Sequence, residues 1–160
     1  MIKDILRILE NDARTSAKQI STMTNTPAAA VARLIKQAEK DRIILKYKAV
    51  INWDKVENEQ VWALIEVKVI PQKDVGFDAI AERIYRFPQA RSVYLASGEY
   101  DLAVLVSGKT ERQIADFVSQ KLAPIDGVQG TVTHFILKRY KEDGEILEGK
   151  EEVERQPVIL

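Results

Sequence analysis

Residues 61–70 alternate between two sets of side chains, and this alternation constrains the fold more than any other feature of the sequence. The first set is wholly apolar, and the second mixes apolar with charged residues: Val61, Ala63, Ile65, Val67 and Val69, against Trp62, Leu64, Glu66, Lys68 and Ile70. A strand places alternate residues on opposite faces, whereas a helix would scatter each set around its surface. The segment is therefore predicted to be a β-strand.

The segments that follow continue in a regular order. The apolar spacing predicts helices over 74–87 and 110–122, and strands over 91–96, 100–106 and 127–139. A glycine-containing connection, Ser97-Gly98-Glu99, joins the two middle strands as a hairpin. The order βαββαβ predicts a ferredoxin-like sheet. Because Trp62 and Leu64 leave the second face of this sheet partly apolar, a homodimer through that face is expected.

Three short helices are predicted ahead of the sheet. The first covers residues 2–11, Ser16 caps the second, and Asn25 takes a left-handed conformation at the break that follows. Thr26-Pro27 is interpreted as the cap and first residue of a third helix that ends near Asp41. The segment Ile43–Ile51 suits a small two-stranded wing or a single strand.

These elements predict an α+β protein with two domains. Residues 1–51 form a three-helix winged helix-turn-helix, 52–59 a polar linker and 60–140 the ferredoxin-like domain. Residues 141–160 form an acidic C-terminal tail whose glutamates Glu148, Glu151, Glu152 and Glu154 are interpreted as solvated.

Charge is divided unevenly along a chain whose net charge is zero. Residues 1–50 contain ten Lys or Arg and five Asp or Glu, which leaves +5 there and −5 in the remainder. A basic N-terminal segment on a neutral protein indicates that this segment alone approaches a polyanion.

Composition excludes several chemistries and gives an expected location. Zero cysteines and one histidine argue against disulfides, thiolate metal sites and cysteine nucleophiles. No catalytic residue, metal or cofactor is therefore predicted. Charges interrupt the apolar residues at the start of the chain, so no signal peptide or membrane segment is expected and the cytoplasm is the predicted location.

Two motifs that suggest chemistry have better structural interpretations. Gly108-Lys109-Thr110 resembles the end of a phosphate-binding loop, but Ala103 stands where that loop needs a glycine. His134 lies in a strand with no Ser, Cys or paired carboxylate near it in sequence, so it is interpreted as a structural or interface residue.

The segment Ser97-Gly98-Glu99-Tyr100-Asp101 has two interpretations. It is an ordinary hairpin turn, or it is a ligand loop in which the glycine admits a ligand to the backbone while Tyr100 and Asp101 add a ring, a hydroxyl and a carboxylate. A zwitterionic amino acid would suit such a loop.

The whole chain resembles the Lrp/AsnC (feast/famine) transcription regulators. Residues 12–16 and 40–47 occupy the family's helix-turn-helix and wing positions, and Ser97–Asp101 occupies its Gly-x-x-Asp turn. The resemblance implies double-stranded DNA and an amino-acid-like effector as ligands, and sheet-mediated dimers that assemble further into octamers. The effector-site candidates that it implies are Gly98, Tyr100, Asp101, Thr131 and Thr133.

The third helix departs from the family pattern. Pro27 replaces a capping serine, Leu34 an arginine, Ala38 a leucine and Arg42 a glycine. Direct base reading needs long polar side chains near the helix start, whereas three alanines there offer contacts to thymine methyls at most. The DNA-binding candidates are Ala28, Ala29, Ala30, Arg33, Lys36, Lys40 and Lys46. The cations are expected to contact phosphates, which position a protein without reading sequence.

Two other functions fit the same domain pair. One is a stand-alone sensor and oligomerisation module whose helix-turn-helix no longer binds DNA specifically. The other is an enzyme similar to the sirohaem decarboxylases, although no tetrapyrrole-binding motif surrounds His134.

Overall fold

The computed structural model describes residues 1–57, 60–70, 73 and 76–148, and its contacts divide the chain into two compact units, Met1–Ile51 and Asn52–Leu160. The first contains three helices: α1 (Ile2–Asn11), α2 (Ala17–Thr24) and α3 (Ala28–Lys40). Their inward faces form a small core of Ile5, Leu9, Ile20 and Val31. The α+β fold class is confirmed, with its helical part at the N-terminus.

The predicted ends of α2 are confirmed. The Ser16 hydroxyl accepts the N–H of Gln19, and the Gln19 side chain accepts the N–H of Ser16, so the two residues form a capping box. Asn25 ends the helix at φ 50°, in the left-handed region that asparagine tolerates. The start of α3 differs by one residue, because Pro27 is the cap and Ala28 the first helical residue.

The strand predicted within Ile43–Ile51 does not form. No residue between 41 and 52 is in a strand, although Ile43 and Leu45 are exposed apolar residues of the kind that strands favour. A strand needs a neighbouring strand to pair with, and no described strand pairs with this segment; the Ile43 and Ile44 N–H groups donate instead to Ala38 O of α3. Arg42, at φ 57°, turns the chain out of α3 into this segment.

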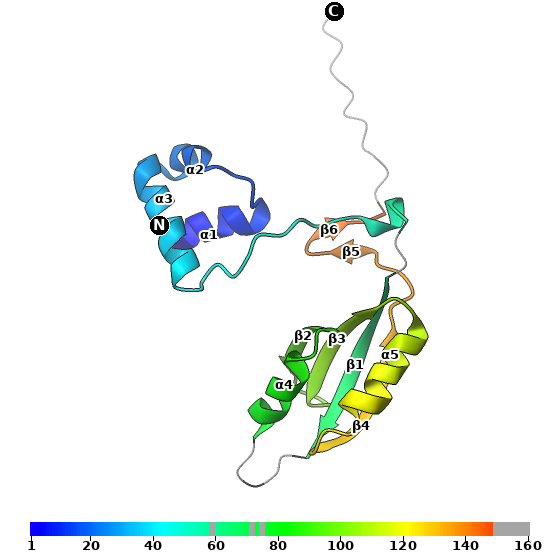
Figure 1. Cartoon of the computed structure of the whole chain (residues 1–160). Helices are drawn as coiled ribbons and strands as arrows, with labels where there is room; N and C mark the ends of the chain where they lie inside the picture. The colour runs from blue at the N-terminus through cyan, green and yellow to red at the C-terminus, as the bar shows by residue number, and fades with distance from the viewer. Residues whose placement is uncertain (58–59, 71–72, 74–75, 149–160) are drawn as a thin grey trace, which may run out of the picture. The chain divides into compact units, whose positions relative to one another are not determined.

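The second unit is built on a four-stranded antiparallel sheet in the order β2-β3-β1-β4 (Figure 1). Its strands are β1 (Val61–Val69), β2 (Ala90–Leu95), β3 (Leu102–Gly108) and β4 (Val128–Phe135). Two helical segments lie on the same side of the sheet: α4 (Phe77–Tyr85), and α5 (Glu111–Phe117) continued by a π-helix (Val118–Leu122). The predicted order βαββαβ is confirmed.

The alternation in β1 separates the two faces of this sheet as predicted. Ala63, Ile65, Val67 and Val69 are buried against the helices, together with Val104 and Val106 of β3. Trp62, Leu64, Glu66 and Lys68 belong to the opposite face, which no described helix covers. We call this second surface the open face.

Several helices and strands begin or end at residues other than those predicted. The strand from 127 ends at Phe135 rather than near Arg139, and β3 begins at Leu102, so Tyr100 and Asp101 lie in the preceding loop. The predicted helix 110–122 is α-helical only to Phe117 and continues as a π-helix. The wider π turn places both Val118 and Leu122 in the core.

The predicted linker and the predicted acidic tail both contain short elements. The linker 52–59 includes a 3₁₀ helix, η1 (Trp53–Lys55), capped by the Asn52 side chain. Within the acidic tail 141–160, β5 (Lys141–Glu142) pairs with β6 (Glu145–Ile146). Asp143 and Gly144 join them at φ 46° and 86°, as a tight hairpin turn requires. Glu151, Glu152 and Glu154 lie outside the described residues.

Candidate nucleic-acid interface and ligand loop

One exposed face of α3 gathers four of the seven DNA-binding candidates. Ala29, Arg33, Lys36 and Lys40 follow one another at intervals of four, three and four residues, which places them on one side of a helix. All four are exposed, whereas Val31 and Ala38 on the other side are buried. The first unit therefore presents a cationic stripe that begins close to the N-terminus of α3.

The carboxylates near this stripe are engaged by other groups. The Gln37 amide donates to both oxygens of Asp41 at 2.9 Å, and the Tyr47 hydroxyl donates to Glu39 Oε1 at 2.8 Å. Among the described residues, no carboxylate oxygen lies within 4.0 Å of the three cations of the stripe. Arg33, Lys36 and Lys40 are thus available to phosphate groups.

Tyr47 connects the segment after α3 to that helix. Partial burial, and then the hydrogen bond to Glu39, raise the pKa of the Tyr47 hydroxyl above its ordinary value of 10.0. The hydroxyl therefore stays protonated and continues to donate to Glu39 at neutral pH.

The remaining three candidates lie outside the stripe. Ala28 and Ala30 flank it on the first turn of α3, the first exposed and the second half-buried. Lys46 lies in the segment after the helix and is also exposed. No described contact joins Lys46 to the stripe.

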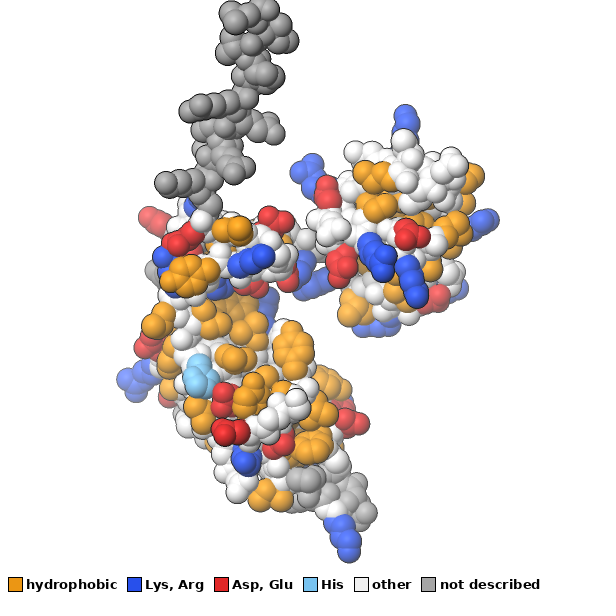
Figure 2. Space-filling view, turned by 180° about the vertical axis from the view of Figure 1, so that it is seen from behind, with side chains coloured by type: hydrophobic (Ala, Val, Ile, Leu, Met, Phe, Trp, Pro, Cys, Tyr) orange, Lys and Arg blue, Asp and Glu red, His pale blue; other side chains and the backbone are white. Residues whose placement is uncertain are grey.

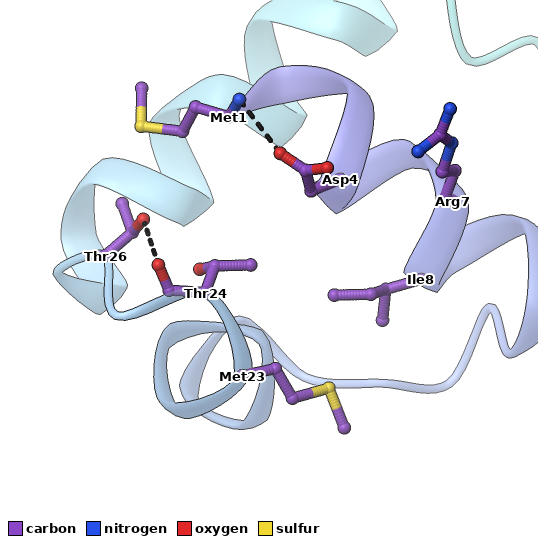
Figure 3. Close-up of a pocket in the computed structure, with 7 residues that line it drawn as sticks. All are labelled: Met1, Asp4, Arg7, Ile8, Met23, Thr24 and Thr26. Atoms are coloured by element: carbon purple, nitrogen blue, oxygen red, sulfur yellow. Dashed lines mark hydrogen bonds and ion pairs between the residues drawn. The ribbon is translucent and has the colours of Figure 1, made fainter.

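A hollow of about 370 Å³ lies between α1 and the end of α2 (Figure 3). Its lining comes from seven residues: Met1, Asp4, Arg7, Ile8, Met23, Thr24 and Thr26. None of the sequence-predicted site residues is among them.

The Ser97–Asp101 loop is attached to the end of β1 by its last residue. The Asp101 N–H donates to Val67 O at 3.0 Å, and Asp101 Oδ2 accepts the Val69 N–H at 2.7 Å. Asp101 O also accepts the Ala96 N–H at 2.9 Å, which closes the loop. The pairing of β1 with β4 shifts register between Lys68 and Val69, where Asp101 supplies the acceptor for Val69.

Gly98 provides the open part of this loop. Its φ of +125° is a conformation that residues with a side chain rarely adopt, and a Cβ built there would meet nothing within 4 Å. Tyr100 is half-buried next to Asp101. Backbone groups at Gly98 are therefore accessible, while the carboxylate of Asp101 already has a structural partner.

Thr131 and Thr133 lie on β4, on the other side of β1 from the loop. Thr131 pairs with Val67 and Thr133 with Ile65, so both belong to the face that the helices cover. Thr131 is level with Asp101, because Val67 is the neighbour of both. Thr133 lies two residues farther from the loop.

The open face carries the histidine and a cluster of apolar side chains. His134 Nε2 lies 3.2 Å from Glu66 Oε1, and Figure 2 shows apolar side chains and an acidic side chain close to the histidine. The strand pairing brings Leu64, Leu105, Tyr94 and Val132 to this face. A carboxylate partner for His134 was not evident from sequence because Glu66 is on another strand.

Sequence reasoning also missed a stack of side chains at one end of the open face. The guanidinium groups of Arg91 and Arg139 lie 5.8 Å and 5.5 Å from the centre of the Trp62 ring. These distances are typical of cation–π contacts. The three residues come from separate segments, so no local pattern in the sequence could have indicated the stack.

The described residues contain neither a metal site nor a membrane-spanning helix. No group of three or more His, Asp or Glu side chains is arranged to hold a metal ion there. In the same residues, no helix has both the length and the apolar character to cross a membrane.

Family models match both units of the chain. A winged helix-turn-helix DNA-binding model matches residues 2–44, and the Lrp/AsnC ligand binding domain matches residues 62–146. This pair of domains defines a DNA-binding transcriptional regulator that carries its own ligand-binding domain. The chain belongs to the Lrp/AsnC family.

Individual relatives agree with this assignment. The uncharacterized HTH-type transcriptional regulator YugG of Bacillus subtilis (strain 168) is 47% identical over 146 residues, which cover 91% of this chain and 88% of that protein. A Neisseria meningitidis transcriptional regulator, NMB0573, solved as an L-Met complex, is 25% identical with a TM-score of 0.68, over 88% and 90% of the two chains. The leucine response regulatory protein (LrpA) of Mycobacterium tuberculosis shares the fold, with a TM-score of 0.72 at 20% identity over 92% and 97%.

Proposed function

We propose that this protein regulates transcription by binding DNA through the exposed face of α3 and by responding to an amino acid held at the Ser97–Asp101 loop. The observation that carries the DNA-binding part is the stripe of Arg33, Lys36 and Lys40, whose neighbouring carboxylates are already engaged. Cations that hold no carboxylate bind phosphate without first breaking an ion pair.

The first turn of α3 determines how this DNA binding would work. Ala28, Ala29 and Ala30 have no side-chain donors or acceptors, so they cannot form the bidentate hydrogen bonds that distinguish bases in the major groove. The stripe therefore supplies affinity and register, and an oligomer that engages several sites at once supplies selectivity.

A salt titration of binding to the region upstream of the protein's own gene tests this part. Wild-type protein is expected to bind that region more tightly than random DNA, with a dissociation constant below about 10⁻⁵ M in low salt. The Arg33→Ala/Lys36→Ala variant is expected to bind more weakly, and its salt slope should be smaller by about 0.9 for each phosphate that it no longer neutralises. Arg112→Ala, an exposed cation on α5, is the control. Equal salt slopes in all three proteins would contradict the proposal.

The ligand proposal rests on the loop geometry and on the family. The Lrp/AsnC ligand binding domain covers the loop, and the Neisseria relative was solved with L-methionine. In the proposed site, the accessible backbone at Gly98 binds the polar groups of the amino acid, and Asp101 holds the loop in place. Tyr100, Thr131 and Thr133 remain candidate contacts.

Thermal unfolding in the presence of each of the twenty amino acids tests the ligand proposal. A ligand at about 100 times its dissociation constant adds roughly 2.7 kcal/mol to the free energy of unfolding. The active amino acid is expected to raise the melting temperature of the wild type and of Gly76→Ala, but not of Gly98→Val. Gly76 also has space for a Cβ but is the N-cap of α4, outside the proposed site. An equal shift in all three proteins would exclude the loop as the site.

The open face of the sheet is the proposed dimer interface. Leu64, Tyr94, Leu105 and Val132 form an apolar surface there, and Tyr94 and Val132 are largely exposed. Apolar patches of this kind usually mark contacts between proteins. Assembly of such dimers into octamers is the further expectation that the family supplies. Sedimentation equilibrium tests the interface, with Leu64→Asp expected to produce monomers.

One observation favours a second candidate function. The three alanines that open α3 suit a sensor and oligomerisation module that has lost specific DNA binding. Unchanged DNA retention by Arg33→Ala/Lys36→Ala would favour this alternative over the regulator.

Catalysis is not part of the proposed function. Incubation with sirohaem followed by absorbance spectroscopy tests this directly, because a bound tetrapyrrole produces a strong visible band. A stoichiometric band that decays as product forms would show an enzyme.

A further inference from the structure

His134 and Glu66 form a pair on the open face that joins two neighbouring strands. His134 Nε2 lies 3.2 Å from Glu66 Oε1. The two residues sit diagonally across β4 and β1, because His134 pairs with Leu64, two positions before Glu66. Their side chains are 53% and 31% exposed, so water solvates both groups in a single chain.

The side chains next to this pair on the open face are apolar. Val132 is the strand partner of Glu66, Leu64 is the partner of His134, and Leu105 of β3 lies opposite Leu64. Figure 2 shows apolar side chains close to the histidine. A protein surface that covers this part of the face therefore removes the pair from water and leaves it mainly among apolar groups.

Few other titratable groups face the pair. The open face also carries Lys68 on β1 and Tyr94 on β2, whereas its positions on β3 are Ala103, Leu105 and Ser107. Beyond β4, Lys138 pairs with Glu148, and at that end of the sheet Arg91 and Arg139 lie over the Trp62 ring. Among the described residues, His134 is the one basic side chain within 4.0 Å of the Glu66 carboxylate. Glu66 thus depends on His134 for a close positive charge.

Removal of water changes which protonation state of the pair is favoured. In mildly alkaline solution an exposed histidine is neutral and an exposed glutamate is ionised, so such a pair carries one negative charge. A lone charge is disfavoured away from water. One added proton removes it, either as an ion pair with the proton on the imidazole or as two neutral groups with the proton on the carboxyl. Covering the pair therefore increases its affinity for a proton, whichever group holds it.

We propose that the pair of His134 and Glu66 makes the self-association of this protein depend on pH, with each copy taking up a proton as the open face is covered. This inference rests on the proposed dimer through that face. A two-fold dimer brings one pair from each copy to the shared surface. Association is therefore favoured as the pH falls from mildly alkaline to mildly acidic, and the dependence ends where separate chains already hold the proton.

The composition of the chain restricts which groups respond in this pH range. Histidine is the side chain that ordinarily changes charge between pH 5 and 8, and the chain has one histidine and no cysteine. An α-amino group also titrates there. The amino group of Met1 pairs with Asp4 in the first unit, so its effect persists in a variant of His134 and can be subtracted.

Sedimentation equilibrium of the full-length protein at pH 6 and at pH 8, at one ionic strength, tests the inference. The wild-type dimer is expected to have a dissociation constant lower by about tenfold or more at pH 6. His134→Gln keeps a hydrogen-bond donor but cannot titrate, so its dissociation constant should be equal at the two values. Glu10→Gln, which changes an exposed carboxylate on α1, is the matched control and should keep the wild-type dependence.

Glu66→Gln gives a readout that a merely structural role of the pair would not produce. Without the carboxylate, covering the imidazole favours its neutral form, because burial disfavours a lone positive charge. The dimer of this variant is therefore expected to weaken as the pH falls, which reverses the sign seen in the wild type. A Glu66→Gln dimer that still strengthens toward pH 6 would contradict the inference.

The outcomes separate the proton linkage from the dimer itself. If the wild type dimerises equally well at both pH values, or if His134→Gln keeps the wild-type dependence, the inference is wrong and the dimer proposal stands. If Leu64→Asp leaves self-association unchanged, the open face is not the interface, and both proposals fail.

Calorimetric dilution counts the protons without relying on a change in affinity. The heat of dissociation in buffers with different ionisation enthalpies reports the number of protons released. Wild-type dimers in mildly alkaline buffer are expected to release protons, up to about two for each dimer, and His134→Gln none. Equal release from the two proteins, or no release from the wild type, would overturn the inference.

Discussion

Asp101 Oδ2 accepts the backbone N–H of Val69 at 2.7 Å, so a loop residue completes the hydrogen bonding of the central strand β1. Val69 is buried, and this carboxylate accepts its N–H. Asp101 is therefore a structural residue of the loop before any ligand arrives.

This bond predicts how substitutions at Asp101 affect stability. Asp101→Ala leaves a buried N–H unpaired, and we expect the free energy of unfolding to fall by about 1–3 kcal/mol. Asp101→Asn keeps an oxygen acceptor and is expected to retain most of the wild-type stability. Urea denaturation measures both values. Glu99→Ala, at an exposed position in the same loop, is the control and should change stability by less than about 0.5 kcal/mol.

Replacing Gly98 should destabilise the protein because of its backbone conformation. Crowding is not the cause, because space for a side chain is available. At φ +125° a Cβ strains the chain, so Gly98→Ala is expected to cost about 1–3 kcal/mol. Gly130→Ala, where φ is not positive and space is also free, should cost less. Equal losses in urea denaturation would show that the loop relaxes around the new side chain.

The capping box at the start of α2 predicts a stability loss in the first unit. Ser16→Ala removes the acceptor for the Gln19 N–H and should lower the free energy of unfolding by about 1 kcal/mol. Ser16→Asp keeps an acceptor and should restore most of the loss. Circular dichroism during urea denaturation follows both, with Lys18→Ala on the exposed side of α2 as the control. A Ser16→Ala variant as stable as the wild type would contradict the prediction.

Alkaline pH should weaken the attachment of the segment after α3. Because the pKa of Tyr47 is raised in the folded protein, its contribution to stability is complete below pH 10.0 and is lost as pH rises through the folded-state pKa. The effect is small, since Tyr47 is partly exposed. Difference absorbance between wild type and Tyr47→Phe isolates its titration. Glu39→Gln should lower the pKa only in part, because partial burial is the larger cause; an unchanged pKa would rule out the bond to Glu39.

The elements predicted correctly are those determined by residues that lie close together in the sequence. Ser16 caps α2, Asn25 ends it, and the alternation in 61–70 gave β1 its two faces. Each of these depends on residues within a few positions of one another. The predictions of fold class and element order were therefore correct.

The differences arise where distant residues decide the outcome. Ile43–Ile51 has the composition of a strand but pairs with no described strand, whereas two-residue strands such as β5 and β6 are too short to show a period. Asp143-Gly144 was the available signal for that hairpin.

The candidate sites also combine features that local sequence predicts with features that depend on contacts between distant residues. The exposed face of α3 followed from helical spacing alone. The engagement of Glu39 by Tyr47, and of Asp101 by Val69, depends on contacts across turns and strands, which spacing does not encode. Whether a cation or a carboxylate is available to a ligand was therefore visible only in the structure.

The bond between Asp101 and Val69 also has a mechanical consequence. β1 holds the Ser97–Asp101 loop at one end and, along the same strand, carries Trp62, Leu64 and Glu66 on the open face. The loop and the proposed dimer surface therefore share one continuous strand. If the proposed ligand binds at the loop, no intermediary domain separates it from the proposed dimer surface.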